Sequence, residues 1–579
     1  MNEIVLKGVS ISKGIAIGSP FFLTEKKDNP PHLELALGEI EKEIERYHLA
    51  LKKSKVDLEH LQSRFVNDGA TVVVEILGAQ LEILHDPIIT HLVEERIKVS
   101  HKNTEAVFQE VINEYNKVFE KIDDDDFEER ISDIKDVSRR ILRHLRPLKK
   151  ETAACEKNSI VIAPDLIPSD ALEAHFSEIK GFVAEKGGYT SHVGIIARAK
   201  GIPYVAKVNI DALMNLDIKN MIVDGISGEI IVNPSSETLK KYSILQEKYH
   251  KYFLEISSHV HLAAKTIDGE DVKIFSNIES LDDVPQVLQN KADGIGLYRS
   301  EYIVLTEKQF PSEERQFEIY KKILEKLEGR PAIVRLFDLG SDKMHFFLSE
   351  EVDIDHEMNP SLGCRGIRFL IKNNGIFEKQ LRALLKASIY GNLRILIPMV
   401  SDISEFLLVK DKIKKTREDL EKEGKKVAKN IPLGCMIEVP SCAIMSHNFA
   451  KEADFFSIGS NDLTQYVIAA DRSNPDTNYL YDFSHPSLFK LIEMTIKSAK
   501  KYKKEVIICG EMAADSKFTE LLIGMGIRSF SISASNIATI KYAVRKTDAK
   551  DAIAMAKEAL KINNVEDLKN FILKDQTVF

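Results

Sequence analysis

The sequence predicts an α/β protein in two parts: an α/β domain interrupted by helices, followed by a (β/α)8 barrel. Three observations lead to this fold class. Strand-like patterns stand on both sides of a long helical block in the first half of the chain. A glycine-rich loop then leads into a helical pattern. The second half alternates short apolar runs with helical stretches, which is typical of a barrel of parallel strands.

Composition sets the broad class of protein. The chain has 579 residues, enough for several domains, and a formal net charge of -9 without a long basic block, which argues against a nucleic-acid binder. Its 5 cysteines are scattered and include no CxxC pair, which favours a reducing cytoplasm over a disulfide framework or zinc site. The sequence shows no signal peptide and no apolar run that could span a bilayer. We therefore expect a cytoplasmic protein without membrane insertion.

The first domain is expected in two segments, 1–23 and 147–233, with a helical subdomain at 24–146 inserted between them. Strand alternation fills the first segment, and it resumes in the second at 159–163, 181–184 and 229–232. From Leu33 onward, apolar residues recur at steps of three and four, which predicts a long amphipathic helix. Further helical patterns follow at roughly 69–85, 87–98, 103–121 and 127–144. The acidic run 123–126 lacks the spacing of a calcium loop and predicts a solvated turn before a helix.

One loop concentrates the chemistry of this domain, GGYTSHVGIIAR at 187–198. Its two glycines permit a tight turn, and the apolar residues after His192 predict a helix that begins there. The N–H groups and the positive dipole end of that helix would stabilise an anion on His192. The loop therefore predicts a phosphohistidine, against the alternative that His192 is an ordinary capping or core histidine.

A helical linker is expected at 234–258, because Asn233-Pro234 has the pattern of an N-cap followed by proline and an apolar stripe continues beyond it. The remaining residues, 259–579, are expected to form the barrel. Its strands are predicted from short apolar runs at 272–278, 294–298, 332–337, 393–399, 433–438, 454–459, 505–509 and 529–533.

Polar residues follow these runs at their C-terminal ends, where the active sites of (β/α)8 barrels lie. Arginines there would grip an anion with more than one acidic group, and carboxylates among them are explained by a hard cation such as Mg²⁺. The pattern predicts a site for a phosphorylated carboxylic acid with Mg²⁺, against the alternative that the arginines are surface ion-pair partners. The residues are Arg299, Glu301, Arg335, Asp338, Glu438, Asn461, Asp462, Arg472, Cys509, Gly510 and Glu511.

These motifs resemble those of the PEP-utilising enzymes, where PEP is phosphoenolpyruvate. The 187–198 loop resembles the phosphohistidine motif of that family. The similarity is greatest to its enzyme I branch, which begins the bacterial sugar phosphotransferase system. The motifs that resemble its PEP-binding barrel are, in order, GLYRSE (296–301), VRLFDLGSDK (334–343), NPSLGCRGIR (359–368), IEVP (437–440), FFSIGSNDLTQY (455–466), DRSN (471–474) and CGEMA (509–513).

The resemblance implies a role for each residue that matches a motif. His192 would accept the phosphoryl group of PEP and Cys509 would protonate the enolate. The PEP ligands would be Arg299, Arg335, Asn461, Asp462 and Arg472, with Glu438 and Asp462 as ligands of Mg²⁺. The resemblance also implies a small histidine phosphocarrier protein that docks on the 24–146 helices, a swivelling phosphohistidine domain, and a homodimer formed through the barrels.

Three alternatives share some of these features. Pyruvate phosphate dikinase or PEP synthase would share the loop and the barrel but needs a large ATP-binding domain ahead of them. A regulatory, non-sugar phosphotransferase paralogue would carry an N-terminal sensory domain. A non-enzymatic signalling scaffold would be expected to have lost some of the charged site residues or Cys509, and all of them are present.

The chain also departs from the family pattern at several positions. Ala171 replaces a threonine that orients the phosphorylated histidine, which leaves that role open to Ser169, Thr190 or Ser191. Gln80 stands in the helical subdomain where a histidine is common. The other departures lie in the barrel motifs, at Ser341, Ser361 and Cys364.

Overall fold

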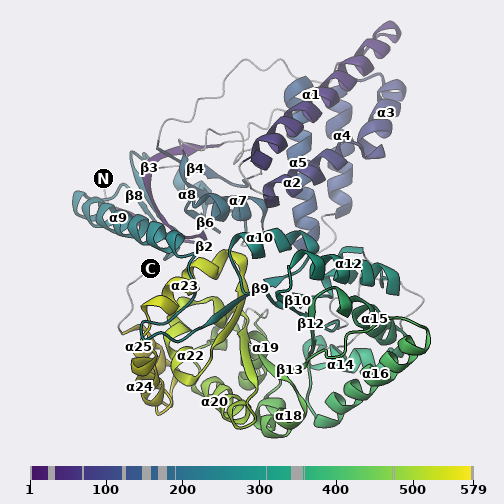
Figure 1. Cartoon of the computed structure of the whole chain (residues 1–579). Coiled ribbons are helices and arrows are strands. Elements are labelled where there is room, and N and C mark those ends of the chain that lie inside the picture. Colours follow the sequence, from purple (N-terminus) through teal and green to yellow (C-terminus); the bar gives the residue numbers. More distant parts are fainter. Residues whose placement is uncertain are drawn as a thin grey trace. The chain divides into compact units, whose positions relative to one another are not determined.

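The computed structural model divides into two compact units, Met1–Tyr252 and Phe253–Val578. The first is an α/β unit with a bundle of helices and the second is a closed barrel of parallel strands, so the predicted fold class is confirmed (Figure 1). The structure describes residues 3–23, 33–67, 71–119, 125–145, 158–166, 179–188, 191–214, 216–307, 309–340, 357, 359–472, 474 and 476–574.

A mixed sheet forms the centre of the first unit, in the order β1-β8-β7-β3-β4-β5-β6-β2. The middle strands β3, β4, β5 and β6 run parallel, and the others pair antiparallel. Apolar clusters cover both faces: one includes the residues of α7 and the helical bundle, the other those of α8. The bounds are β1 Ile4–Lys7, β2 Val9–Ser12, β3 Ile15–Phe22, β4 Ser159–Ala163, β5 Ile179–Ala184, α7 His192–Lys200, β6 Tyr204–Ala206, α8 Ile210–Met214, β7 Met221–Asp224 and β8 Glu229–Val232.

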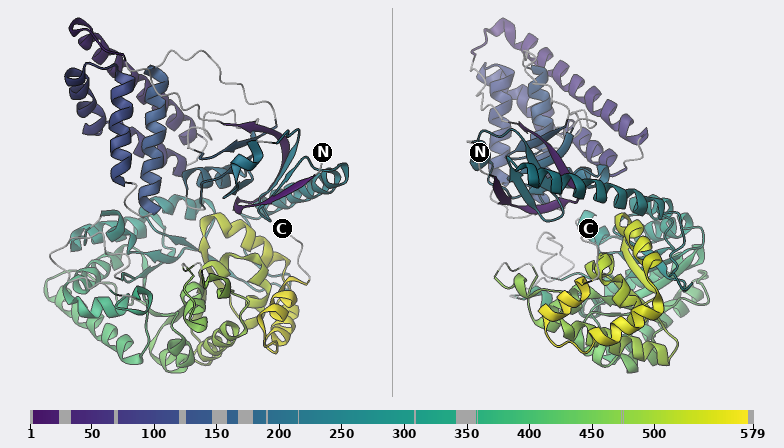
Figure 2. Two further views of the ribbon diagram at one scale, coloured as in Figure 1. Left: turned by 180° about the vertical axis from the view of Figure 1, so that it is seen from behind. Right: turned by 90° about the vertical axis from the view of Figure 1, so that its left-hand side faces the viewer.

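Between β3 and β4 the chain forms a bundle whose helices run alongside one another (Figure 2). Its long first helix begins later than the sequence predicts, at Ile40 after a short 3-10 turn, rather than near Leu33. The reason is that Leu33 and Leu35 hydrogen-bond through their backbone N–H groups to Asn103 and His101, which holds this segment extended. The bounds are α1 Ile40–Asn67, α2 Thr71–Ile83, a π-helical segment Ile88–Leu92, α3 Val93–Ser100, α4 Thr104–Phe119 and α5 Asp125–Leu145.

Helix α9, Ser236–Ser258, follows β8. The predicted cap at Asn233 is wrong: Asn233 has φ 48°, and its side chain accepts from Lys219 N and donates to Asp217 O, closing a turn. Ser235 caps the helix instead, since its Oγ accepts from Thr238 N at 3.1 Å. An asparagine tolerates this left-handed backbone well, which is why a cap pattern could also mark a turn.

The two parts of α9 have different partners. Its first part belongs to the α/β unit, because Tyr242 packs on the sheet and Gln246 Nε2 donates to Ile15 O at 2.8 Å. Its end belongs to the barrel unit, where Glu255 pairs with Lys546 at 3.2 Å and the ring of His259, just after the helix, packs edge-on against Tyr542. A single helix therefore carries an anchor to each unit.

The eight predicted strands of the second unit are confirmed, and they close into a barrel in sequence order with β16 beside β9. Helices lie outside the ring of strands (Figure 1). The strands are β9 Lys273–Ile278, β10 Ile295–Arg299, β11 Pro331–Arg335, β12 Asn392–Ile397, β13 Leu433–Ile437, β14 Phe455–Gly459, β15 Glu505–Cys509 and β16 Ser529–Ser533. The helices are α10 Val284–Gln289, α11 Tyr302–Glu307, α12 Glu313–Lys326, α14 Ile367–Lys372, α15 Asn374–Ala387, α16 Ile403–Lys422, α17 Pro440–Ile444, α18 Ser446–Glu452, α19 Ser460–Ile468, α20 Pro486–Lys501, α21 Glu511–Ala514, α22 Thr519–Met525, α23 Ile537–Lys546, α24 Ala549–Ala559 and α25 Val565–Leu573.

Side chains from alternate strand positions fill the barrel. The inner cluster is apolar and buried, so the barrel is a packed core rather than a pore. At the N-terminal end of the strands, Glu505 accepts from Arg394 Nη1 at 2.7 Å, Ser529 Oγ at 3.0 Å and Lys273 Nζ at 3.3 Å. These hydrogen bonds join four strands at the N-terminal end of the barrel. The C-terminal end of the strands is thus free to form an active site. The inner cluster consists of Phe275, Leu297, Ile333, Leu396, Met436, Phe455, Ile507 and Cys509.

Within the part of the chain that the structure describes, none of the helices has the length and apolar character needed to cross a membrane.

The packing of the barrel core gives a stability prediction. A Cβ at Gly434 on β13 would lie 2.3 Å from the Phe455 ring, far inside contact distance. Gly434→Ala should therefore lower the unfolding free energy of the barrel by about 1–3 kcal/mol through overpacking. Gly375→Ala is the matched control, because nothing lies within 4 Å of that position, and it should cost no stability. Urea unfolding monitored by circular dichroism measures both, and equal midpoints for the two variants would contradict this packing.

Candidate active site

His192 is the first residue of α7, as the loop pattern predicts. Ser191 is the N-cap: its Oγ accepts from Gly194 N at 3.2 Å and donates to Gly188 O at 2.7 Å, which fixes the turn before the helix. Gly187 has φ 134°, and a Cβ there would lie 2.2 Å from the Tyr204 hydroxyl, so the turn needs glycine. The structure thus places His192 at a capped helix start in the first unit, while the other predicted site residues belong to the second.

The structure bears on only some of the departures from the family pattern. Of the candidates for orienting His192, Ser191 is engaged in the cap, and Ser169 and Thr190 lie outside the described residues, as do the replaced positions Ala171 and Ser341. Gln80 is buried, 1% exposed, and its amide donates to Asp133 Oδ1 at 3.2 Å and Asp136 Oδ2 at 3.0 Å on α5. Gln80 therefore acts inside the bundle by joining α2 to α5, and does not present its amide on the surface.

In the barrel, every predicted residue lies at or just beyond the C-terminal end of a strand, or on the loop that follows it. Arg299 and Arg335 end β10 and β11, and Glu438 follows β13. Asn461 and Asp462 open α19 directly after β14, Arg472 lies on the loop after α19, and Cys509 ends β15. Because the parallel strands close into a barrel, all of these positions lie around the same opening, at the C-terminal ends of the strands. We call this opening the mouth of the barrel.

Buried ion pairs organise this mouth. Arg335 pairs with Glu301, and its Nη1 lies 3.2 Å from Asp338 Oδ2. Asp338 also accepts two bonds from Arg365, from Nη2 at 2.8 Å and from Nε at 3.2 Å. Burial acts to lower the pKa of both guanidinium groups, but the neighbouring carboxylates outweigh it and raise the pKa of each, so both stay charged.

Arg365 continues the network to the start of α19. Its Nη1 lies 3.5 Å from Asp462 Oδ1 and donates to the Tyr466 hydroxyl at 3.3 Å. Sequence reasoning missed Arg365, because it follows no strand and comes from the long connection between β11 and β12. It stands inside the NPSLGCRGIR motif, and that motif was the signal that could have identified it.

Two departures from the family pattern flank this arginine. The Ser361 carbonyl accepts from the Tyr466 hydroxyl, and Cys364 N donates to the Glu357 carboxylate at 2.9 Å. Both bonds use backbone atoms, so the identity of either side chain is not what holds the segment in place.

Glu438 is completely buried beside this network. Its Oε1 accepts from Met399 N, while Oε2 has no hydrogen-bond partner among the described residues. Burial, and to a smaller extent the nearby carboxylates of Asp462 and Asp338, raise the pKa of Glu438 to about 8, although Arg335 and Arg365 act to lower it. An unpartnered carboxylate oxygen next to a second carboxylate is an arrangement that a divalent cation would satisfy. Arg335 Nε and Glu301 Oε2 are also buried without a partner in the described part of the chain.

Cys509 lies at the top of the barrel core, 1% exposed. Its thiol donates to Ile458 O at 3.3 Å and accepts from Ser457 Oγ at 3.7 Å. Burial raises the pKa of Cys509 to about 11, since the lowering effects of Ser457, Arg335 and Arg299 are smaller. The group is therefore a protonated thiol at neutral pH, close enough to the arginines and Glu438 to feel their charges.

The rim of the mouth is more exposed. Arg299 is half-buried and donates to Glu279 Oε1 at 2.7 Å. The amide of Asn461 makes a reciprocal pair with Glu511, donating to Oε1 at 3.2 Å and accepting from the backbone N at 2.9 Å. Gly510 between Cys509 and Glu511 has φ 91°, and a Cβ there would meet Asn461 Oδ1 at 2.6 Å. This glycine is what lets the two turns approach.

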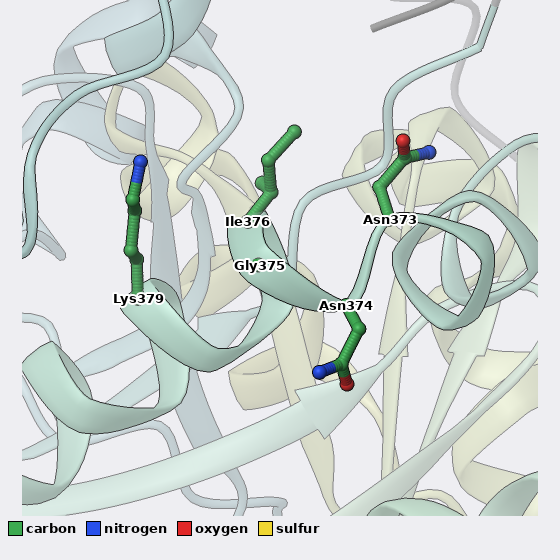
Figure 3. A pocket seen from close by; sticks show the side chains of 5 residues that line it. All are labelled: Asn373, Asn374, Gly375, Ile376 and Lys379. Carbon is green, nitrogen blue, oxygen red and sulfur yellow. The ribbon is translucent and has the colours of Figure 1, made fainter. Parts of the chain in front are cut away.

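A pocket of about 290 Å³ lies elsewhere on the barrel unit, at the start of α15. Figure 3 shows its lining residues, Asn373, Asn374, Gly375, Ile376 and Lys379. None of the predicted site residues lines it, so the polar mouth and this pocket are separate features.

Comparison with known proteins covers almost the whole chain. Three family models match in order: "PEP-utilising enzyme, N-terminal" over residues 7–130, "PEP-utilising enzyme, mobile domain" over 155–228 and "PEP-utilising enzyme, PEP-binding domain" over 255–549. The phosphoenolpyruvate-protein phosphotransferase of Listeria monocytogenes is 36% identical over 573 residues, 98% of this chain and 99% of that protein. Those of Priestia megaterium and Bacillus subtilis are 37% identical over 573 residues and 36% over 574, each covering 98% of this chain and 98% and 99% of their own.

The raised pKa of Glu438 predicts a pH-dependent stability. Because the folded pKa of about 8 lies above the ordinary 4.5, the native state holds a proton that the unfolded state releases between these values. Stability should therefore fall as pH rises through that window, by a few kcal/mol at most. Glu438→Gln should remove this slope in metal-free buffer, while Glu421→Gln, on the exposed face of α16, should keep it. Melting temperatures from pH 5 to 8.5 measure the effect, and parallel curves for wild type and Glu438→Gln would refute it.

Proposed function

The chain belongs to the PEP-utilising enzyme family and, within it, to the phosphoenolpyruvate-protein phosphotransferases, and from this premise we propose that it transfers a phosphoryl group from PEP to His192 and then to a histidine of a small phosphocarrier protein. This would be the first step of a sugar phosphotransferase system. The observation that carries the proposal is the barrel mouth, where Arg335 Nε, Glu301 Oε2 and Glu438 Oε2 are buried without a hydrogen-bond partner among the described residues, near the buried thiol of Cys509.

The substrate assignments follow from charge. PEP carries a phosphate and a carboxylate, and guanidinium groups bind both in bidentate fashion. We assign Arg299, Arg335 and Arg472 to these groups together with Asn461 and Asp462, and we add Arg365, which bridges Asp338 and Asp462. The assignments taken from the sequence rest on position at or after the strand ends and on the family motifs, whereas that of Arg365 rests on its contacts with Asp338 and Asp462.

Glu438 and Asp462 are proposed to hold Mg²⁺. Within the described residues no three His, Cys, Asp or Glu side chains gather as a metal site, but Mg²⁺ commonly takes only one or two protein carboxylates and completes its shell with substrate oxygens. Glu438 Oε2, which has no hydrogen-bond partner in the part of the chain that the structure describes, fits that requirement. When bound, the ion would offset negative charge on the transferring phosphoryl group.

His192 and Cys509 account for the bond formed to phosphorus and for the proton that completes pyruvate. A neutral ring nitrogen of His192 attacks the phosphorus of PEP, the bond from phosphorus to the enol oxygen breaks, and its electron pair stays on the oxygen as an enolate. The Cys509 thiol gives its proton to the terminal carbon of the enolate, which completes pyruvate and leaves a thiolate that water reprotonates. The phosphoryl group then passes from His192 to the histidine of the carrier.

His192 must reach the barrel mouth and the carrier in turn, so the proposal includes a swivelling motion of the phosphohistidine domain about the α9 region. We propose that the carrier docks on the 24–146 helices and that two chains pair through their barrels. A cytoplasmic location is proposed as well, and it is supported by the cysteines Cys364, Cys435, Cys442 and Cys509, which are free thiols.

Labelling from PEP tests the nucleophile. His192→Ala should keep the fold yet retain at least about 100-fold less acid-labile phosphoryl label than wild type, because no other residue is proposed to attack phosphorus. His250→Ala, an exposed histidine on α9, is the matched control and should label normally. Radiolabelled PEP with Mg²⁺, followed by filter binding and acid treatment, gives the measurement. Full labelling of His192→Ala would contradict the assignment of His192 as the nucleophile.

A second variant separates proton transfer from phosphoryl transfer. Cys509→Ala should slow pyruvate formation about 10²–10⁴-fold, the usual contribution of a positioned acid. It should still accept phosphate on His192 from the phosphorylated carrier, since that exchange does not involve the enolate. Cys442→Ala, which removes another buried thiol, serves as control. Pyruvate release and carrier exchange are measured side by side, and an equal loss in both would mean that Cys509 is structural.

A further inference from the structure

Gln380 is a polar residue on an otherwise apolar face of α15. Its side chain is completely buried, and its neighbours on that face, Phe377, Leu381 and Leu384, pack into the core of the barrel unit. An apolar residue would fill this position without the cost of taking an amide out of water. The amide is tolerated because both of its polar atoms find hydrogen-bond partners inside the barrel unit.

Those partners lie at the ends of two neighbouring strands. Gln380 Oε1 accepts from Phe337 N at 3.1 Å, just beyond β11, and Nε2 donates to Ser300 Oγ at 3.0 Å, just beyond β10. The Ser300 hydroxyl in turn donates to Arg335 O at 2.5 Å. The two strands pair in register up to Arg299 and Arg335. The side-chain bonds therefore continue the link between the strands past their last paired residues.

The two segments that Gln380 joins carry the ion pairs of the mouth. Ser300 precedes Glu301 and Phe337 precedes Asp338, and these two carboxylates are the partners of Arg335. All three charged groups are buried. A shift of one strand end against the other would separate charges that have little water to replace a lost partner. The spacing of the strand ends therefore sets the position of the Arg335 guanidinium.

The amide of Gln380 has a single orientation. Because the backbone N–H of Phe337 can only donate, the atom that accepts from it is Oε1, and the nitrogen must face β10. Nε2 also donates to the Tyr320 hydroxyl at 3.3 Å, and that hydroxyl donates to Gln316 Oε1 at 3.2 Å. The nitrogen of the Gln316 amide donates to a backbone carbonyl of the loop before α12 at 3.1 Å. These further bonds thus lead away from the strand ends.

We propose that Gln380 is a positioning residue for the substrate: its amide holds the ends of β10 and β11 at the spacing that keeps the Arg335 guanidinium aligned with PEP. This inference rests on the proposed function, in which Arg335 binds PEP. Gln380 acts through the two strand ends and touches neither PEP nor the reacting atoms.

Gln380→Leu removes the amide and keeps a side chain of similar size. The KM for PEP should rise about tenfold while kcat stays within about threefold, because Arg335 is displaced whereas His192 and Cys509 are unchanged. Pyruvate release with an excess of carrier protein, measured well below the melting temperature, gives both constants. The melting temperature of each variant reports on folding.

Gln316→Leu is the matched control. Gln316 is a buried glutamine on α12, 1% exposed, and its loss also breaks hydrogen bonds in the interior. This variant should lower the melting temperature about as much as Gln380→Leu does, yet keep the KM for PEP within about twofold of wild type. A role of Gln380 in stability alone would instead leave the KM of both variants unchanged.

Ser300→Ala tests the same link with a smaller change, and it decides the question if Gln380→Leu does not fold. It removes the hydroxyl that connects Gln380 to Arg335 O, and it should raise the KM for PEP about three- to tenfold. Together, the two changes should raise KM by less than the product of their single effects, because both act on one link.

Three results would overturn the inference: an unchanged KM in either folded variant, an equal rise of KM in Gln316→Leu, or fully multiplicative effects in the double variant. Failure of wild type to release pyruvate from PEP would overturn the proposed function as well. An active wild type whose KM is insensitive to both changes would overturn only the inference.

Discussion

The carboxylate of Asp338 is the group on which the barrel mouth depends. It lies between two guanidinium groups, 3.2 Å from Arg335 Nη1 and 2.8 Å from Arg365 Nη2. Arg335 ends a strand and Arg365 comes from a distant part of the β11–β12 connection, so one carboxylate joins two segments, which are also linked by the backbone hydrogen bond from Gly366 N to Leu339 O. Removal of a single partner from such a buried group leaves an uncompensated charge, which is far more costly than loss of an exposed pair. The mouth therefore holds together as a unit.

The centre of the barrel mouth contains more carboxylates than guanidinium groups. Glu301, Asp338 and Glu438 are each no more than 1% exposed, and the cations beside them are Arg335, which is buried, and Arg365, which is partly buried. Burial is the main cause of the raised pKa of Glu438, and the neighbouring carboxylates add to it, because a proton removes part of the excess negative charge. A bound cation would do the same. Proton and cation thus compete for one carboxylate, and cation affinity must weaken as pH falls.

Much of this molecule could be predicted from the sequence, and the reasons differ by region. The barrel strands are short, apolar and evenly interleaved with helices, so local pattern alone located all of them. The helix at His192 was equally predictable, since its cap and glycine turn are local. The predictions at Leu33 and Asn233 were wrong because non-local contacts decide the local structure there. Asn103 and His101 hold the segment at Leu33 extended. Asp217 and Lys219 close the turn at Asn233. Partners distant in sequence decide such cases.

The same reason explains what was missed at the site. Arg365 follows no strand, and only the folded connection brings it to Asp338 and Asp462. The pairing of Arg335 with Glu301, and of Asn461 with Glu511, also needs the closed ring of strands before it exists. Residue types at strand ends could be read from the sequence, but their partners could not.

Helix α9 has one further consequence. Gln246 fixes it to the α/β unit and Glu255 fixes it to the barrel unit. Successive residues of an α-helix are turned by about 100° about its axis. The number of residues between the two anchors therefore sets their angular phase, and a change in length by one residue would rotate one anchor to another side of the helix. Only a change in length close to a whole turn, about three or four residues, would leave the two anchors on nearly the same sides of the helix.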